Sequence, residues 1–309
     1  MYIVNRSKTF KSESLRLVTR GDLDGLVAAM LITTMEPVEE LELVHPQDIT
    51  DNKFEVRKND ILSNLPYHPD CSMWFDHHEL TESNRTPPEN FRGKHALLPS
   101  VARVVFEHYT SEKLKRYEPL VAETDRFDSA QLSLQDISDP HGAILLGFTI
   151  DPRTGFGLET ALFVKLMELL RTADVGLALN FPQIAQRIAE CRENDATAMQ
   201  ALRDNSRLDG NVIITDFRNV EKPPVGNRFL IYLVYPQANV SVRVQWGPQK
   251  EFVAVTVGHS IINRTCATHI GRLCSDYGGG GHRGAGACTL TLKEADRSIS
   301  DIVRTLKEG

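Results

Sequence analysis

The chain has 309 residues, of which 41% are hydrophobic and 25% are charged, and its formal net charge is −6. This composition is typical of a globular protein long enough for two domains, and no apolar run approaches the ~20 residues that would span a bilayer. The acidic balance argues against a protein that holds long duplex nucleic acid through its phosphates. Five scattered cysteines without a CxxC, and no signal-peptide pattern in residues 1–14, lead us to expect a cytoplasmic protein without a membrane partner.

The first two-thirds of the chain alternates short apolar strands with amphipathic helices. This alternation predicts an α/β fold, with a mostly parallel sheet and helices on both of its faces. The expected strands are residues 15–20, 41–46, 60–65 and 71–76, and the expected helices are residues 26–35 and 100–114.

A long polar helix is expected next, and after it the order of predicted elements changes from alternating strands and helices to successive strands. Consecutive strands are expected at residues 211–217, 229–236, 240–246 and 251–259, which indicates a smaller α+β domain with a mixed sheet. We therefore predict a larger domain at residues 1–181, a connector helix at residues 182–206 and a smaller domain at residues 207–309.

Three clusters of acidic residues follow apolar stretches. Asp22 and Asp24 lie in "TRGDLDGL", Asp76–His78 lie in "WFDHHE", and Asp125 and Asp128 lie in "LVAETDRFDSA". We expect all three clusters at strand ends of one sheet, where open α/β sheets bind ligands. Each cluster alone could be an ordinary turn, surface loop or helix face. Together they provide the carboxylates and imidazoles of a two-metal site for in-line attack on phosphorus.

The stretch "YGGGGHRGAGA" (277–287) contains four successive glycines. Glycines expose backbone N–H groups without a Cβ, so we expect a loop that an anion can approach closely. His282 and Arg283 add two cationic donors, and Arg264 precedes the run. A flexible linker is the alternative, but linkers of that kind are rich in serine and lie between domains.

Taken together, these motifs resemble those of the DHH phosphoesterase superfamily, in which a DHH domain precedes a DHH-associated C-terminal domain. The resemblance covers nearly the whole chain, and relatives include RecJ-like exonucleases, oligoribonucleases and exopolyphosphatase-related proteins. It implies that Asp22, Asp24, His77 and Asp125 bind one or two manganese ions, with Mg²⁺ as the alternative cation.

The resemblance also implies that residues 1–181 form the catalytic domain and residues 207–309 the substrate-binding domain, and it implies roles for the remaining motif residues. Asp76 would orient the ring of His77, and His78 would contact the scissile phosphate in an interdomain cleft. The residues implied in substrate binding are Arg264, Gly279, Gly280, Gly281, His282 and Arg283.

Two positions depart from the family pattern. Arg20 stands where the first motif usually has a histidine or aspartate, and Asn64 stands where the second motif usually has a bridging aspartate. Asp60 is a poor substitute because it precedes the expected strand, whereas Asp128 is a further ligand position. We therefore expect one firmly held metal, or a site that is empty without added manganese.

The sequence thus predicts a metal-dependent phosphoesterase for a small phosphate ester or a short oligonucleotide. Two alternatives stay open: a catalytically weakened protein that binds phosphate or nucleotides, and an exopolyphosphatase-like hydrolase. A homodimer is compatible with the sequence.

Overall fold

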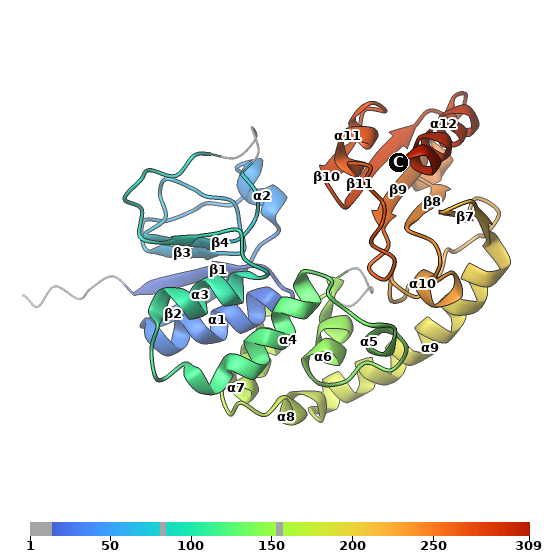
Figure 1. Ribbon diagram of the computed structural model, residues 1–309. Helices are drawn as coiled ribbons and strands as arrows, with labels where there is room; N and C mark the ends of the chain where they lie inside the picture. Colours follow the sequence, from blue (N-terminus) through green and yellow to red (C-terminus); the bar gives the residue numbers. More distant parts are fainter. Residues whose placement is uncertain (1–13, 81–84, 153–156) are drawn as a thin grey trace, which may run out of the picture. The chain divides into compact units, whose positions relative to one another are not determined.

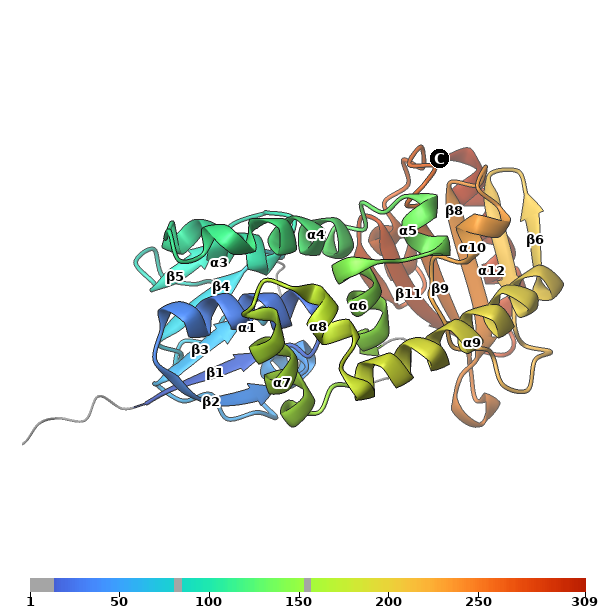
Figure 2. The same cartoon turned by 90° about the horizontal axis from the view of Figure 1, so that it is seen from below.

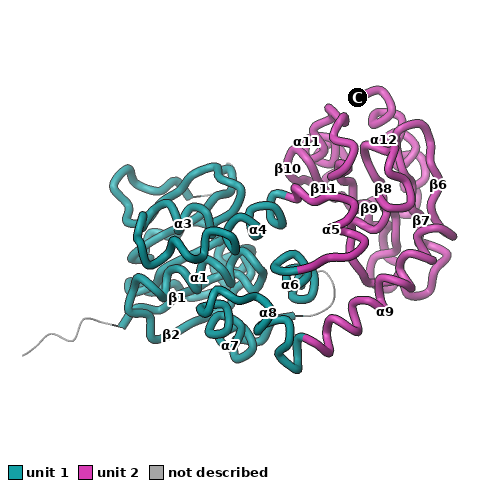
Figure 3. Tube along the Cα trace, turned by 60° about the horizontal axis from the view of Figure 1, so that its bottom comes forward, with its two compact units in different colours: residues 1–129, 142–152, 156–184 teal, residues 130–141, 153–155, 185–309 magenta. Residues whose placement is uncertain are grey.

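The computed structural model describes residues 14–80, 85–152 and 157–309, which form two compact units (Figures 1 and 3). Of these residues, unit 1 comprises 14–80, 85–129, 142–152 and 157–184, and unit 2 comprises 130–141 and 185–309. The expectation for the signal-peptide region concerns residues that lie outside the described ranges, apart from residue 14. None of the helices in those ranges has the length and apolarity that crossing a membrane requires.

Unit 1 contains a five-stranded sheet, here called sheet A, whose strands all run parallel in the order β2-β1-β3-β4-β5. Its three central strands are short, apolar and buried, as expected for a parallel sheet covered on both faces. The strands are β1 (Leu15–Thr19), β2 (Val38–Leu43), β3 (Asp60–Ser63), β4 (Met73–Asp76) and β5 (Gly93–His95). The predicted α/β fold is confirmed.

The central helix of unit 1 is α1 (Leu23–Met35), whose residues from Leu23 to Ile32 are all buried. It lies on one side of sheet A and packs against α3 (Val101–Tyr109), α4 (Glu118–Asp128) and α7 (Thr160–Leu170) (Figures 1 and 2). On the other side of the sheet, α2 (Pro46–Thr50) packs its Ile49 into a core with residues of β1, β3 and β4. The remaining helical segments of unit 1 are α3 (Val101–Tyr109), η1 (Lys115–Tyr117), α4 (Glu118–Asp128), α6 (Gly142–Ile150), α7 (Thr160–Leu170) and α8 (Val175–Leu179).

A buried ion pair joins the amino ends of β1 and β3. The guanidinium of Arg16 donates from Nε to Oδ1 and from Nη2 to Oδ2 of Asp60, each over 2.7 Å. Such a bidentate pair satisfies both charges away from water. Asp60 therefore stabilises the sheet at the end opposite to Asn64 and does not replace it as a ligand.

The helix α9 (Pro182–Asn205) leads into unit 2, which contains a mixed six-stranded sheet, here called sheet B. Its order is β10-β11-β9-β8-β7-β6, and only β7 and β8 pair in parallel. Gly210, with φ +65°, makes the Asp-Gly turn between β6 and β7. The strands are β6 (Ser206–Asp209), β7 (Val212–Asp216), β8 (Val240–Trp246), β9 (Val253–His259), β10 (Gly280–His282) and β11 (Ala285–Leu290).

Apolar residues on one face of sheet B pack against α11 (Ile270–Ser275) and α12 (Ala295–Glu308) to form the core of unit 2. The strand expected at residues 229–236 is wrong, because this stretch forms the short helix α10. A short apolar run does not distinguish a buried strand from a buried helix. The Tyr232 hydroxyl lies 2.9 Å from Ser241 Oγ and 3.0 Å from the His259 carbonyl oxygen, so α10 packs against the sheet instead of extending it. The helical segments of unit 2 are α5 (Leu134–Ser138), α10 (Ile231–Val234), η3 (Pro248–Lys250), α11 (Ile270–Ser275) and α12 (Ala295–Glu308).

Candidate metal centre

Three side chains from different elements of unit 1 meet beyond the carboxyl ends of sheet A. One ligand atom from each of Asp24, His77 and Asp128 lies within 4.8 Å of the others. Nε2 of His77 is 3.6 Å from Oδ2 of Asp24 and 3.3 Å from Oδ2 of Asp128. Asp24 lies in the first turn of α1 after β1, His77 directly follows β4, and Asp128 is the last residue of α4.

The ring of His77 is oriented by the backbone. Its Nδ1 lies 3.0 Å from the carbonyl oxygen of Leu98, an acceptor, so Nδ1 carries the proton and donates it. Nε2 then presents its lone pair between two carboxylates. It is buried and has no hydrogen-bond partner among the described residues. A divalent cation would satisfy all three groups at once, so the donor set fits a metal.

The carboxylate of Asp24 is buried, with 1% of the residue exposed. Its oxygens accept hydrogen bonds from the backbone N–H groups of Val101 (2.9 Å) and Ala102 (2.8 Å) at the start of α3. Burial, followed by the charges of Asp128 and Asp22, raises the pKa of Asp24 well above its ordinary value, and the two backbone bonds oppose that rise. A bound cation would favour the ionised carboxylate, as the two backbone hydrogen bonds do.

Further polar atoms lie at the same ends of the strands. Thr19 Oγ1 ends β1, Ser63 Oγ ends β3, and Asn64 Oδ1 follows it; all three are buried without a hydrogen-bond partner among the described residues. Such atoms are rare in folded proteins and call for an explanation such as an ion or water. Sequence reasoning missed Thr19 and Ser63. Their signal is a hydroxyl residue at the end of an otherwise apolar strand.

Asp22 lies beside the three-residue group and is engaged by its neighbours. It is the N-cap of α1, where its Oδ1 accepts a hydrogen bond from the Gly25 N–H over 2.9 Å. The side-chain amide of Asn64 donates to the same oxygen over 3.3 Å, and Arg20 Nε lies 3.0 Å from Oδ2. The ligand role of Asp22 stays a prediction. The two departing positions, Arg20 and Asn64, both contact it.

We expected the third acidic cluster at a strand end, but Asp125 and Asp128 both belong to the helix α4. The carboxylate of Asp125 accepts hydrogen bonds from Ser100 Oγ (2.6 Å) and from Arg103 Nε (2.8 Å), and it pairs with Arg103 Nη2 (2.7 Å). Asp128 is the α4 carboxylate that meets Asp24 and His77. A ligand role for Asp125 stays a prediction.

We expected Asp76 to orient the ring of His77, but its carboxylate contacts the ring of His78 instead. Its Oδ1 accepts a hydrogen bond from the backbone N–H of His77 over 2.9 Å and lies 2.8 Å from Nδ1 of His78. The side chain of His78 is 52% exposed and can meet a ligand. Burial acts to lower the pKa of His78, but the hydrogen bond to Asp76 and the charges of Asp76 and Asp128 outweigh it and raise that pKa.

The glycine run in unit 2 is a strand and not the loop that we expected, because Gly280–His282 form β10 and pair with β11. A Cβ on Gly279 would lie 2.0 Å from the Ala287 carbonyl oxygen, and Gly281 has φ +148°. These glycines are therefore required by close backbone packing. At Gly280, by contrast, a Cβ would meet no atom within 4 Å.

The cationic residues near this strand are exposed. Arg264 donates to the carbonyl oxygens of Ile261 (3.0 Å) and Ala130 (2.7 Å). His282 ends β10, and Arg283 begins the turn into β11. The substrate-binding roles of these residues stay predictions.

Comparison with known proteins places this architecture among solved structures. No family model matches the chain, and neither does any curated protein. Among solved structures, a pGpG-specific phosphodiesterase, PggH from Vibrio cholerae, is 34% identical, with 96% of this chain and 99% of that chain covered and a TM-score of 0.82. The chain belongs to the DHH phosphoesterase superfamily.

Two more distant members of the superfamily share the fold. The DHH domain of a protein from a family of ribosomal proteins is 10% identical, with 95% of this chain and 87% of that chain covered and a TM-score of 0.62. RecJ from Thermus thermophilus in complex with Mn²⁺ is 15% identical, with coverages of 95% and 52% and a TM-score of 0.59. Membership of this superfamily and the group formed by Asp24, His77 and Asp128 support phosphoesterase activity.

Proposed function

We propose that this protein is a metal-dependent phosphodiesterase that hydrolyses short linear dinucleotides with a 5′-phosphate, such as pGpG, to mononucleotides. The observation that carries the proposal is the meeting of Asp24, His77 and Asp128 in a chain that is similar, over nearly its whole length, to a pGpG-specific phosphodiesterase. The acidic net charge also favours a short substrate over a long nucleic acid.

Asp24, His77 and Asp128 would hold the metal, with Asp22 as a further candidate ligand. Two or three carboxylates and one imidazole suit Mn²⁺ or Mg²⁺. A cation of this kind supplies Lewis-acid activation of water and neutralises charge on the phosphate. The Leu98 carbonyl and the N-terminus of α3 are the groups that fix His77 and Asp24 for this purpose.

His78 is the candidate for direct contact with the phosphate. The carboxylate of Asp76 holds its Nδ1, which leaves Nε2 to donate a hydrogen bond to a phosphate oxygen. The raised pKa of His78 favours the charged, donating form. Arg264, Arg283 and the strand Gly279–His282 are candidates for further contacts with the nucleotide.

The test is hydrolysis by the full-length protein after chelation and reloading with Mn²⁺ or Mg²⁺. Substrates are pGpG, pApA, cyclic di-GMP, a mononucleotide bisphosphate and polyphosphate, and products are separated by anion-exchange chromatography. We expect pGpG to yield GMP fastest. We expect Asp24→Asn and His77→Ala to lower turnover by well over tenfold, since even residues behind the ligands of a metal site cost about 10–100-fold.

Arg57→Gln is the matched control, because Arg57 lies in unit 1 and pairs with the exposed Glu40 away from these residues. Intact pGpG with both cations would contradict the proposal and favour the alternative of a nucleotide-binding protein. Faster cleavage of polyphosphate than of any dinucleotide would favour the exopolyphosphatase-like alternative.

A further inference from the structure

The two faces of sheet B differ in character. Alternate residues of β8 and β9 are valines that pack against α11 and α12. The intervening residues point to the opposite face, because side chains alternate along a strand. On that face β8 carries Ser241, Arg243 and Gln245.

Arg243 is held in place on this face but has no counter-ion among the described residues. Its guanidinium lies over the ring of Phe217, 4.8 Å from the centroid, and its Nε donates to Oε1 of Gln245 over 3.2 Å. Within the described parts of the chain, Nη1 and Nη2 have no hydrogen-bond partner and no carboxylate forms an ion pair with the residue. Burial lowers the pKa of Arg243, and no neighbouring charge in those parts opposes this effect.

A restrained arginine without a counter-ion is well suited to bind an anionic ligand. Arg218, two residues after the end of β7, is by contrast paired, with carboxylate oxygens of Asp216 and Asp296 each 2.7 Å away. A partly buried cation without such a partner costs free energy, which an anionic ligand would recover. Because Phe217 and Gln245 already restrain the side chain, its terminal nitrogens can meet two oxygens of one phosphate with little further loss of entropy.

The row of residues beside Arg243 leaves room for a ligand. Arg243 pairs in register with Thr256 of β9, Thr256 with Ala287 of β11, and Ala287 with Gly280 of β10. Thr256 and Ala287 are exposed, and the space above Gly280 is open. Between the guanidinium and the glycine strand, this row therefore offers one hydroxyl and otherwise only small groups.

We propose that Arg243 binds the terminal 5′-phosphate of the nucleotide substrate on the face of sheet B opposite to α11 and α12, an inference that rests on the proposed function. The terminal phosphate is the better match for a bidentate guanidinium, because a phosphomonoester carries about −1.5 to −2 charges at pH 7, whereas a phosphodiester carries one. Thr256 is the adjacent hydroxyl donor for the same group.

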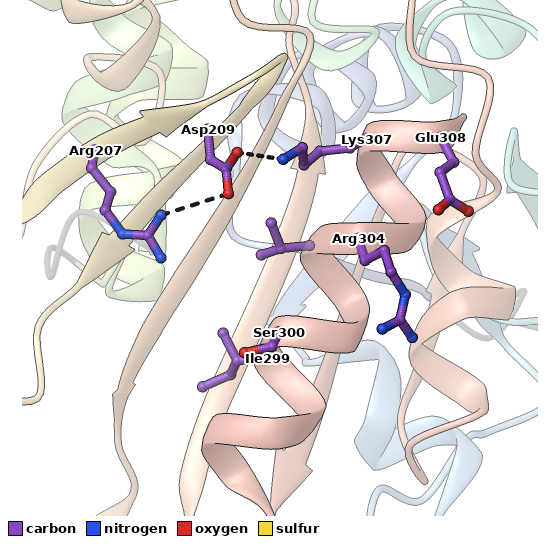
Figure 4. Close-up of a pocket in the computed structure, with 8 residues that line it drawn as sticks. Arg207, Asp209, Ile299, Ser300, Arg304, Lys307 and Glu308 are labelled. Atoms are coloured by element: carbon purple, nitrogen blue, oxygen red, sulfur yellow. Dashed lines mark hydrogen bonds and ion pairs between the residues drawn. The ribbon is translucent and has the colours of Figure 1, made fainter.

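The test compares pGpG with GpG, which lacks the 5′-phosphate, as ligands and substrates of the full-length protein. Variants are Arg243→Gln, which removes the charge, and Arg243→Lys, which keeps the charge and removes the planar fork. The matched control is Arg207→Gln. Arg207 lies on β6 of the same sheet, and its side chain lines a pocket of about 520 Å³ on the α12 side, where it faces Asp209 (Figure 4).

We expect Arg243→Gln to raise the KM for pGpG, and its Kd measured by calorimetry in the presence of a chelator, by about tenfold or more. The kcat, the values for GpG and the thermal midpoint should stay within about twofold or a few degrees of the wild type. Arg243→Lys should give a smaller rise, and Arg207→Gln none. If Arg243→Gln fails to fold, Arg243→Lys provides the test. A KM that rises for pGpG and not for GpG in this variant would support the inference.

Three results would overturn the inference. If wild-type protein cleaves pGpG but neither Arg243 variant changes its KM, only the role of Arg243 is refuted. If the wild type binds and cleaves pGpG and GpG equally well, recognition of the terminal phosphate is refuted while the proposed function stands. If the wild type neither binds nor cleaves either dinucleotide, both proposals are wrong.

Discussion

Asp22 shows how single residues set the charge of the candidate metal centre. Gly25 and Asn64 donate to its Oδ1, and Arg20 lies against its Oδ2. The guanidinium of Arg20 cannot lose its proton, so it permanently offsets part of the negative charge that would attract a second cation. Asn64 has φ +58° and is 2% exposed, and both asparagine and aspartate tolerate this left-handed backbone. The site therefore carries less negative charge than it would with a histidine in place of Arg20 and an aspartate in place of Asn64.

We predict that the wild type holds one metal firmly and that Arg20→His combined with Asn64→Asp raises both the stoichiometry and the affinity for Mn²⁺. The new carboxylate would lie beside Asp22 without the compensating guanidinium, so like charges repel until a cation binds. The double variant should then unfold at a lower temperature in chelator and recover in Mn²⁺. Metal counting by plasma mass spectrometry after desalting, with Arg57→His as control, gives the stoichiometry. Two equivalents tightly held by the wild type would refute this prediction.

At the scale of elements, the N-terminus of α3 fixes the carboxylate of Asp24 by hydrogen bonds. Val101 and Ala102 present their N–H groups to Asp24, and Ser100 caps the same helix by accepting from the Arg103 N–H over 3.0 Å. Asp125 joins the cap to the helix, because it accepts hydrogen bonds from both Ser100 and Arg103. An ordered start of α3 therefore depends on a carboxylate of α4.

We predict different consequences for the two carboxylates of α4. Asp125→Asn should lower the free energy of unfolding by about 1–3 kcal/mol, because a charged hydrogen-bond acceptor is lost. It should also weaken Mn²⁺ binding by about 10–100-fold without changing the stoichiometry, as expected of a supporting residue. Asp128→Asn should abolish metal binding at little cost in stability. Chemical denaturation and metal titration measure these effects. Loss of metal without loss of stability in Asp125→Asn would instead make Asp125 a ligand.

The same elements show what the sequence could predict. The alternation of apolar strands and helices predicted sheet A, and the residues after β1 and β4 pointed to Asp24 and His77, which lie together with Asp128. The pattern could not choose between Asp125 and Asp128, because residues three apart on a helix differ in direction by only about 60°. The glycines were expected to face a ligand, yet Gly279 and Gly281 are needed for backbone packing against β11. Both distinctions depend on tertiary neighbours that no local pattern contains.

At the scale of the whole molecule, the candidate groups for metal and for the terminal phosphate belong to different compact units. Asp24, His77 and Asp128 lie in unit 1, whereas Arg243 lies in unit 2. Each unit has its own sheet and its own hydrophobic core. Binding of a cation alone should therefore stabilise unit 1 selectively, since only a ligand that contacts the folded form of a unit shifts its unfolding equilibrium.

We predict that Mn²⁺ without nucleotide slows amide hydrogen exchange in the segments of unit 1 that carry the metal centre and leaves sheet B unchanged. The segments are residues 19–26, 75–79, 98–104 and 123–129. At a free Mn²⁺ concentration about 100 times its Kd, the expected stabilisation is about 2.7 kcal/mol where exchange requires unfolding of unit 1. His77→Ala should remove this protection, whereas Arg243→Gln should retain it, which makes the second variant a control for the first. Equal protection of both sheets by Mn²⁺ alone, or protection that survives His77→Ala, would contradict a metal centre confined to unit 1.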